Sequence, residues 1–166
     1  MNRVLAGLLA AVLFLSGCVS TGRGLVAGVS TSVDVATQMG RPAERVPAAD
    51  GDTVWFYPNQ PFGRVTYAVR VAPDGRVRSV EQVLDEAHIA RIAANQTTRA
   101  QLREMFGPPY LASYLPRQQR EVWTWNIYNV ARFPFQLHVQ MSDDGIVREV
   151  LMLEERRVPS DLFFRF

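Results

Sequence analysis

Apolar and polar residues alternate in two parts of the chain that lie about 70 positions apart. The first part carries apolar residues at Val65, Tyr67, Val69 and Val71, and the second at Phe135, Leu137, Val139 and Met141. Alternation of this kind predicts β-strands with one face buried. Each run ends in a turn dipeptide, Asp74-Gly75 or Asp144-Gly145, which favours a hairpin into a further strand.

Each alternating run is preceded by a short segment with the signals of a capped helix. Thr31 and Thr98 are good N-cap residues, and an acid or amide follows each of them three places later. Apolar residues spaced four apart come next, and a glycine and a proline then stop the helix. The two segments run from 31 to 42 and from 98 to 109, so the same short helix is predicted twice, 67 positions apart.

Other elements repeat at similar spacing. The β-type run Val54-Trp55-Phe56-Tyr57 corresponds to Val122-Trp123-Thr124-Trp125, and residues 85 to 94 predict a further short helix before the second capped helix. The equivalent place in the first copy, residues 24 to 29, is short and rich in glycine. We therefore predict an α+β fold of two tandem helix-helix-strand-strand-strand units, with antiparallel meander sheets and helices packed on one face.

Sharing an interface gives each unit of about 60 residues more buried surface than it has alone. The predicted boundaries are a signal peptide at 1–17, a lipidated cysteine and flexible tether at 18–27, unit 1 at 28–84, unit 2 at 85–155 and a C-terminal tail at 156–166. The apolar residues Leu162, Phe163 and Phe164 of the tail are expected to dock on the body or on a partner.

The amino-terminal sequence predicts that the protein is exported and anchored to a membrane. Met1-Asn2-Arg3 is followed by an apolar run from Val4 to Leu15, which is typical of a secretion signal and short for a membrane span. The run ends in Leu-Ser-Gly-Cys at residues 15–18, which resembles the lipobox of bacterial lipoproteins. That resemblance implies acylation of Cys18 and cleavage before it. Because Val19 follows rather than aspartate, the outer membrane is the expected location.

Composition argues against nucleic-acid binding and against a disulfide framework. The chain has 166 residues, 18 basic and 16 acidic, and all the basic residues are arginines scattered along the sequence. Such a pattern gives no electrostatic footprint for nucleic acid. Cys18 is the one cysteine, so a mature, lipidated chain would hold no disulfide.

The lipobox and the two repeats together resemble the BamE family, also called SmpA/OmlA, of small outer-membrane lipoproteins. The clearest stretch is Asp85 through Pro109, and the run at 54–57 is similar to the family's first strand. This chain departs from the family by having two units and by carrying Gln96 where the family has glycine. The tandem arrangement also resembles the β-lactamase-inhibitor protein, in which two such units form a concave sheet that grips an enzyme.

The resemblance implies a non-enzymatic accessory role in the machine that inserts β-barrel proteins into the outer membrane, and binding of anionic phospholipid. The alternative is an inhibitor-like or envelope-integrity lipoprotein that binds another periplasmic protein. Both interpretations expect a lipid anchor on the membrane, protein partners in the periplasm or outer membrane, no nucleic acid, and no cofactor besides the lipid on Cys18. A small periplasmic hydrolase is the enzymatic rival.

No catalytic or metal-binding pattern is evident. His88 and His138 have no second histidine or clustered carboxylate at ligand spacing. The candidate partner-binding residues are instead aromatic residues and an arginine, since these types dominate binding hot spots: Trp55, Tyr57, Trp123, Trp125, Tyr128, Arg132 and Phe133. We expect one alternate set of the strand aromatics to face outward and the other to pack in the core.

Overall fold

The computed structural model describes residues 24–155. The predicted signal peptide, the lipidation site at Cys18 and the C-terminal tail lie outside the described residues. No helix among residues 24–155 combines the length and the apolar character needed to cross a bilayer.

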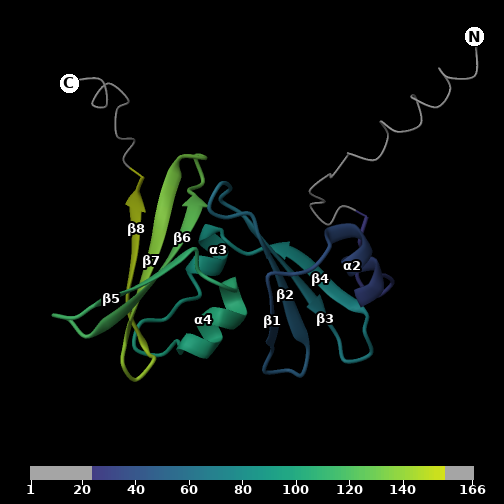
Figure 1. The fold of residues 1–166 in the computed structure, drawn as a ribbon, viewed down its shortest axis with the longest axis horizontal. Coiled ribbons are helices and arrows are strands. Elements are labelled where there is room, and N and C mark those ends of the chain that lie inside the picture. The colour runs from purple at the N-terminus through teal and green to yellow at the C-terminus, as the bar shows by residue number, and fades with distance from the viewer. Residues whose placement is uncertain (1–23, 156–166) are drawn as a thin grey trace, which may run out of the picture.

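Two four-stranded antiparallel sheets make up most of the fold (Figure 1). Sheet 1 has the order β1-β2-β3-β4, and sheet 2 has the order β5-β6-β7-β8. The strands of sheet 1 are β1 (Glu44–Pro47), β2 (Thr53–Pro58), β3 (Thr66–Val71) and β4 (Val77–Gln82). Those of sheet 2 are β5 (Leu111–Leu115), β6 (Arg120–Tyr128), β7 (Pro134–Ser142) and β8 (Val147–Glu154). The helices are α2 (Ser32–Met39), α3 (Glu86–Ile89) and α4 (Arg99–Phe106).

The predicted fold class is therefore wrong. The chain is mostly β, with helices of only eight, four and eight residues, rather than tandem helix-helix-strand-strand-strand units with helices packed on one face. Two segments that follow the capped helices, at 44–47 and 111–115, pair as additional edge strands. The first has only four residues, and the second is exposed at every position, so neither carries the alternation of a longer half-buried strand. Residues 24–29 form no helix.

The two halves nevertheless share local structure at corresponding residues. Thr31 and Thr98 each close a capping box, as the sequence predicts, and Gly40 and Gly107 end the two helices with nearly the same backbone angles. Trp55 is paired with Val69 across its sheet, and Trp123 is paired with Val139. The register shifts at Arg70/Val71 in one sheet and at Gln140/Met141 in the other. The repeated sequence thus specifies repeated caps, turns and strand register.

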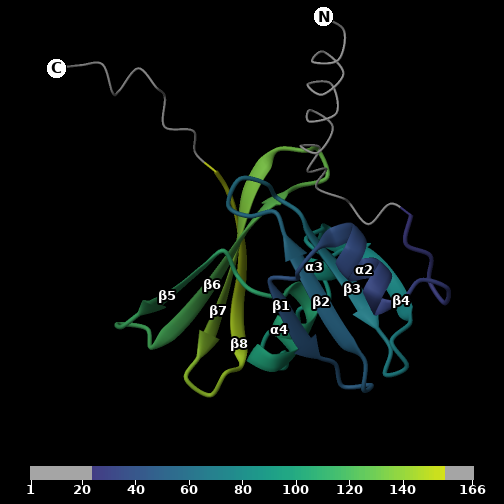
Figure 2. The same cartoon turned by 45° about the vertical axis from the view of Figure 1, so that its right-hand side comes forward.

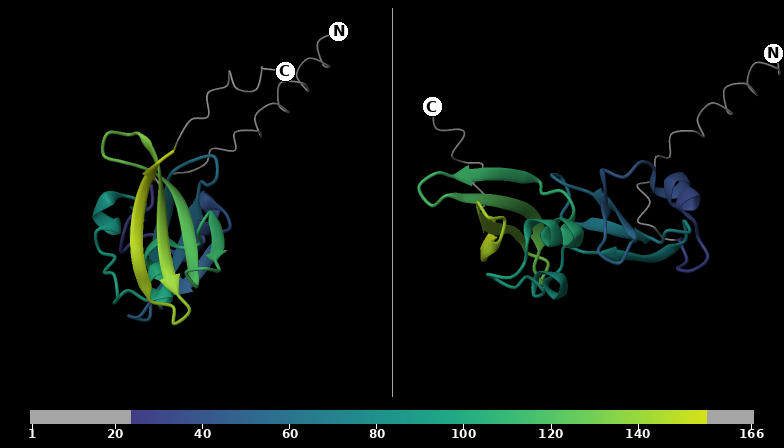
Figure 3. Two further views of the ribbon diagram at one scale, coloured as in Figure 1. Left: turned by 90° about the vertical axis from the view of Figure 1, so that its left-hand side faces the viewer. Right: turned by 90° about the horizontal axis from the view of Figure 1, so that it is seen from below.

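Helix α4 lies between the two sheets (Figures 1 and 2), and the view from below in Figure 3 shows the same arrangement. On one side Leu102 and Phe106 enter the core of sheet 2, which they share with Trp123, Trp125 and other buried residues. On the other side the carboxyl end of α4 lies against sheet 1, since a Cβ added to Gly107 would overlap the Phe56 ring.

Two ion pairs also join α4 to sheet 1. Arg103 contacts Glu44 at 2.8 Å, and Glu104 contacts Arg70 at 3.4 Å. Glu44 belongs to β1 and Arg70 to β3, so the helix is held at two places on the sheet. The helix therefore connects the two sheets through both apolar and charged contacts.

The sheets differ in how their faces are covered. Sheet 1 carries a hydrophobic cluster on each face: Val35 of α2 packs with Trp55, Val69, Val71 and Val77 on one side, and Val54, Phe56, Ala68 and Val83 form the cluster on the other. Sheet 2 contributes one face to its cluster, and its other face bears a polar row. There Thr124 hydrogen-bonds His138 at 2.9 Å, and Gln136 donates to Asn126 at 3.2 Å.

Candidate functional site

The three tryptophans proposed as partner-binding residues lie in the hydrophobic cores. Trp125 has no exposed surface, and Trp55 and Trp123 retain 7% and 6%. The indole N–H of Trp125 donates to the Pro108 carbonyl at 3.1 Å, and its ring lies 5.7 Å from that of Phe106. Trp123 and Trp125 hold α4 against sheet 2, and Trp55 packs under α2. The tryptophans are therefore not available to a partner at the surface of this structure.

Polar groups also contact these tryptophans and the neighbouring Tyr57. The Arg45 guanidinium stacks 3.9 Å from the Trp55 ring centroid, a favourable cation–π distance. Trp123 donates from Nε1 to Glu121 at 2.7 Å. Tyr57 is half-buried and donates its hydroxyl hydrogen to the Gly40 carbonyl at 3.2 Å, which ties sheet 1 to the end of α2. Burial raises the pKa of Tyr57, although nearby Arg45 opposes the shift.

The other three candidates, Tyr128, Arg132 and Phe133, come together at the β6–β7 loop. Tyr128 ends β6 and is 39% exposed, and Phe133 precedes β7 and is 58% exposed. The loop between them is compact: Arg132 donates from its backbone N–H to Asn129 O at 2.9 Å, and Asn129 Oδ1 accepts from Phe133 N–H at 2.8 Å. Arg132 has a positive φ of 64°, a conformation that non-glycine residues rarely adopt outside tight turns and functional sites.

A loop of sheet 1 lies beside this one at the same end of the molecule (Figures 1 and 2). The β2–β3 loop, residues 59–65, contacts Asn126 of β6 twice. Gln60 Oε1 accepts from the Asn126 backbone N–H at 3.0 Å, and the Pro61 carbonyl accepts from the Asn126 side chain at 3.4 Å. Phe62 in this loop is 97% exposed, and Val130 in the β6–β7 loop is 81% exposed. We call Phe62, Tyr128, Val130, Arg132 and Phe133 the loop-end patch.

Two guanidinium groups approach the Tyr128 ring in this patch. Arg64 lies 5.6 Å and Arg132 5.9 Å from the ring centroid. Arg64 forms an ion pair with Glu155, whereas Arg132 makes no ion pair within residues 24–155. A shallow groove of about 250 Å³ runs beside Tyr128, and Asp85 and Glu86 contribute acidic groups to its lining. The patch therefore offers apolar side chains, an aromatic ring and a cation beside a groove with acidic residues.

A larger cleft lies elsewhere, between sheet 1 and the segment from α3 to α4. Its volume is about 420 Å³, and both charged and apolar side chains line it, among them Arg70, Glu81, His88, Arg91 and Glu104. Most of these charges already have partners in the chain. His88 contacts Asp85 at 2.7 Å and Glu81 at 3.5 Å. Burial raises the pKa of Asp85, but hydrogen bonds from His88 outweigh it and hold that pKa below its usual value.

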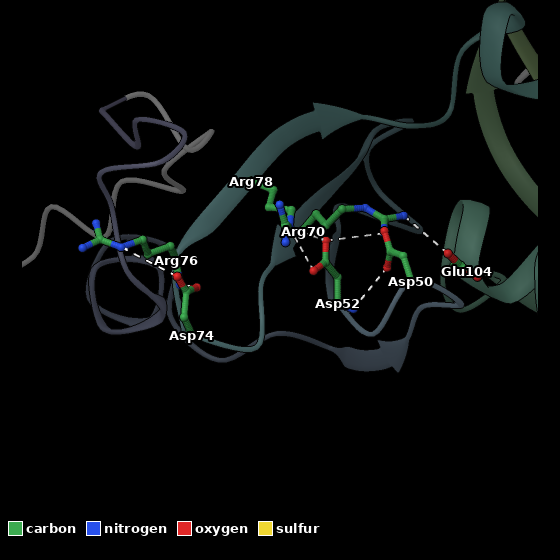
Figure 4. Close-up of polar contacts among 7 residues, drawn as sticks. All are labelled: Asp50, Asp52, Arg70, Asp74, Arg76, Arg78 and Glu104. Atoms are coloured by element: carbon green, nitrogen blue, oxygen red, sulfur yellow. Dashed lines mark hydrogen bonds and ion pairs between the residues drawn. The ribbon is translucent and has the colours of Figure 1, made fainter.

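Figure 4 shows the ion-pair network to which two of the lining residues, Arg70 and Glu104, belong. Arg70 of β3 contacts Asp50 at 2.8 Å, Asp52 at 3.8 Å and Glu104 at 3.4 Å. Asp52 is 2% exposed and also pairs with Arg78 at 2.8 Å, so its buried charge is compensated from two sides. The network links the β1–β2 turn, β3, β4 and α4, and its contact between the two halves is the Arg70–Glu104 pair.

Catalytic and metal-binding arrangements were not expected from the sequence. Within residues 24–155, no group of three or more histidine, cysteine or acidic side chains is placed to hold a metal ion. His138 lies on the polar face of sheet 2, where burial lowers its pKa below the ordinary value.

Sequence reasoning missed Phe62 and most of β5. Phe62 sits between proline and glycine in Gln60-Pro61-Phe62-Gly63, a composition that marks a loop, and loops lie at the surface. That signal alone could have placed an exposed aromatic residue there. The exposed side chains of β5 include Leu111, Tyr114 and Leu115 at 52%, 51% and 37%. They lie in an apolar stretch bracketed by prolines, which the repeat pattern did not include.

The comparisons with known proteins are sparse. No protein-family model matches the chain, and no curated protein matches it. Among solved structures, the chain is similar to a DUF4309 family protein (YjgB) from Bacillus subtilis subsp. subtilis str. 168, at 17% identity over 82% of this chain and 86% of that one, with a TM-score of 0.31. A likeness at that level assigns neither fold nor function.

Proposed function

We propose that this protein is a lipoprotein of the outer membrane, anchored through Cys18 and facing the periplasm, that acts as a non-enzymatic protein-binding module. The process we propose for it is the assembly of outer-membrane β-barrel proteins, because of the BamE-like features of its sequence. The observation that carries the binding role is the loop-end patch. Tyr128, Val130 and Arg132 line one groove, Phe133 follows in the same loop, and Phe62 is exposed in the neighbouring β2–β3 loop.

The composition of the patch supports contact with a protein. Tyrosine, phenylalanine and arginine are enriched at protein interfaces, and lysine is depleted there. Isolated exposed apolar residues are common on monomers and need no explanation, but a contiguous group of them marks an interaction site. Here the hydrogen bonds between Asn126 and residues Gln60 and Pro61 hold the β2–β3 loop of sheet 1 against β6, close to the point where the β6–β7 loop begins.

The anchor and the binding surface are tested separately. Replacing Cys18→Ser is expected to release the chain from the membrane fraction and to remove acyl groups from its mass spectrum. A C18S chain that stays membrane-bound to the same extent would contradict the anchor. This change leaves the described residues intact, so the binding surface can be tested independently of it.

The surface is tested by a photo-crosslinking residue placed at Phe62 or Phe133 in living cells, followed by identification of the linked protein. A matched control carries the same residue at Val33, which is 70% exposed on α2 and lies outside the patch. Patch-specific products that contain barrel-assembly subunits would support the proposal. Patch-specific products with another periplasmic protein would favour the inhibitor-like alternative, and identical products from patch and control positions would contradict a binding role for the patch.

A further inference from the structure

Strand β5 is an edge strand that nothing in the described structure covers. It is the first strand of sheet 2 and pairs on one side with β6. All five of its residues are exposed, and Figures 1 and 2 show it at the outer margin of the molecule, on the side of sheet 2 away from sheet 1. The free side of an edge strand presents unpaired backbone N–H and C=O groups, which form a template for a further strand.

The other three sheet edges carry protection that β5 lacks. The β1 edge contains Glu44, Arg45 and Pro47, and charge and proline both discourage strand addition. The start of β4 is covered by the segment before α2, with Gly28 N–H donating to Val77 O at 2.8 Å and Val77 N–H donating to Ser30 O at 2.9 Å.

The start of β8 is covered in the same way by the segment before α4. Asn95 N–H donates to Val147 O at 2.8 Å, and Val147 N–H donates to Thr97 O at 2.9 Å. Farther along, β8 carries the charged residues Glu149 and Glu154. β5 has the sequence Leu-Ala-Ser-Tyr-Leu, with neither charge nor proline. An edge of this kind is expected where a strand from another chain binds.

The residues of β5 are complementary to a second copy of themselves. If two β5 strands pair in antiparallel fashion about Ser113, Leu111 of one copy lies opposite Leu115 of the other, and Ala112 lies opposite Tyr114. One face of the pair then joins leucine to leucine, and the other joins a small residue to a large aromatic one, with no like charges opposed. Prolines at positions 109 and 116 lie just outside the strand and limit the pairing to about this length.

We propose that β5 is a self-association edge, at which two copies of this protein pair β5 to β5 in antiparallel register about Ser113. Sheet 2 of one copy and sheet 2 of the other then form one continuous sheet across the two-fold axis. Such an interface is isologous, because each copy contributes the same surface. The inference is independent of the proposed binding role of the loop-end patch, which lies in other loops.

The register makes a cysteine test possible, since Cys18 is the one natural cysteine of the chain. In the proposed pair the two Ser113 residues face each other at roughly 4.5–5.5 Å between Cα atoms, which is within disulfide range. The full-length Ser113→Cys chain, oxidised mildly in membranes, is expected to form a reducible dimer. The wild type, carrying Cys18 alone, gives the background.

Gln118→Cys is the matched control. Gln118 is exposed in the turn of the same hairpin, beyond Leu115, so its two copies would lie farther apart than the roughly 13 Å between equivalent Leu115 residues and out of disulfide range. It is expected to stay monomeric. Leu111→Cys and Leu115→Cys are each expected to crosslink poorly alone, at about 13 Å between equivalent residues, and efficiently when the two variants are mixed.

A second measurement does not depend on thiol chemistry. Leu111→Lys places a charge opposite Leu115 of the other copy, and it should shift the purified full-length chain toward monomer in sedimentation while leaving its thermal unfolding nearly unchanged. Equal dimer yields from Ser113→Cys and Gln118→Cys would overturn the proposal. So would linkage of the Ser113→Cys variant to a different protein, or a sedimentation profile that L111K does not alter.

Discussion

Sheet 1 and sheet 2 are formed by similar sequence patterns, but they differ in which of their faces are buried. Sheet 1 has a hydrophobic cluster on each face, whereas sheet 2 buries one face and leaves a polar row on the other. Most of the exposed large apolar side chains also belong to the second half of the chain: Tyr110, Leu111, Tyr114, Leu115, Tyr128, Val130, Phe133, Met152 and Leu153. The two proposed interaction surfaces, the β5 edge and most of the loop-end patch, belong to the half of the chain that contains sheet 2.

The difference arises from the position of α4. The first capped helix, α2, packs on the outer face of sheet 1 and has one neighbouring sheet. The second, α4, lies between the sheets and contacts both. The second helix, α4, therefore has an interface with the first unit that α2 lacks. Equivalent residues of the two helices are expected to contribute unequally to the free energy of unfolding.

The largest predicted effect compares Phe106 with Met39, which occupy equivalent positions in the two helices. Phe106 is fully buried between the sheets, and Met39 is partly buried on sheet 1. We expect Phe106→Ala to lower the free energy of unfolding by about 3–5 kcal/mol and Met39→Ala by roughly 2 kcal/mol or less. Chemical denaturation measures both, and equal losses would mean that α4 is no more deeply integrated than α2.

The next effect compares the two glycines that end these helices. Gly107 and Gly40 have φ of 70° and 76° with ψ of −156° and −155°, so alanine at either position costs about 1–3 kcal/mol for a backbone region that is essentially restricted to glycine. A Cβ at residue 107 would additionally overlap the Phe56 ring, while residue 40 has nothing within 4 Å. Gly107→Ala should therefore cost roughly 1–3 kcal/mol more than Gly40→Ala.

Thermal or denaturant unfolding of the two single variants gives this difference directly. Because the backbone strain is shared, the excess loss at residue 107 reports the contact between the end of α4 and sheet 1. If G40A proved as damaging as G107A, the packing of the two halves against each other would contribute little to stability.

The smallest effect concerns the polar face of sheet 2. Burial lowers the pKa of His138 from its ordinary value of 6.5, so the folded chain binds this proton less readily than the unfolded chain does. The stability associated with His138 is complete above about pH 6.5 and declines as the pH falls through that value toward the lower folded pKa. The decline is modest because the side chain stays partly exposed.

His138→Gln supplies the control, because glutamine can keep a hydrogen bond to Thr124 without titrating. Unfolding curves of wild type and H138Q at about pH 7.5 and about pH 5.5, on either side of the ordinary histidine pKa, should show a larger loss for the wild type on acidification. Parallel losses in the two proteins would mean that His138 is as well solvated in the folded chain as in the unfolded one, and that this face is open to water.

Local features were predictable because they depend on neighbouring residues. The capping boxes at Thr31 and Thr98 need only the residue three places along, and the Asp-Gly turns place Gly75 and Gly145 at positive φ. Of the candidate site, the sequence indicated Tyr128, Arg132 and Phe133, which are exposed at the end of β6 and in the loop that follows it.

The sequence by itself determined the repeat: two capped helices, their glycine stops and the Asp-Gly turns that follow. Only the tertiary structure decided that the chain is mostly β, that the tryptophans are buried, and that Phe62 joins the β6–β7 loop at one end of the molecule. These outcomes depend on contacts between residues far apart in the chain, such as Gly107 with Phe56 and Gln60 with Asn126. Local propensity does not determine which face of a sheet is covered by such contacts or which edge strand stays exposed.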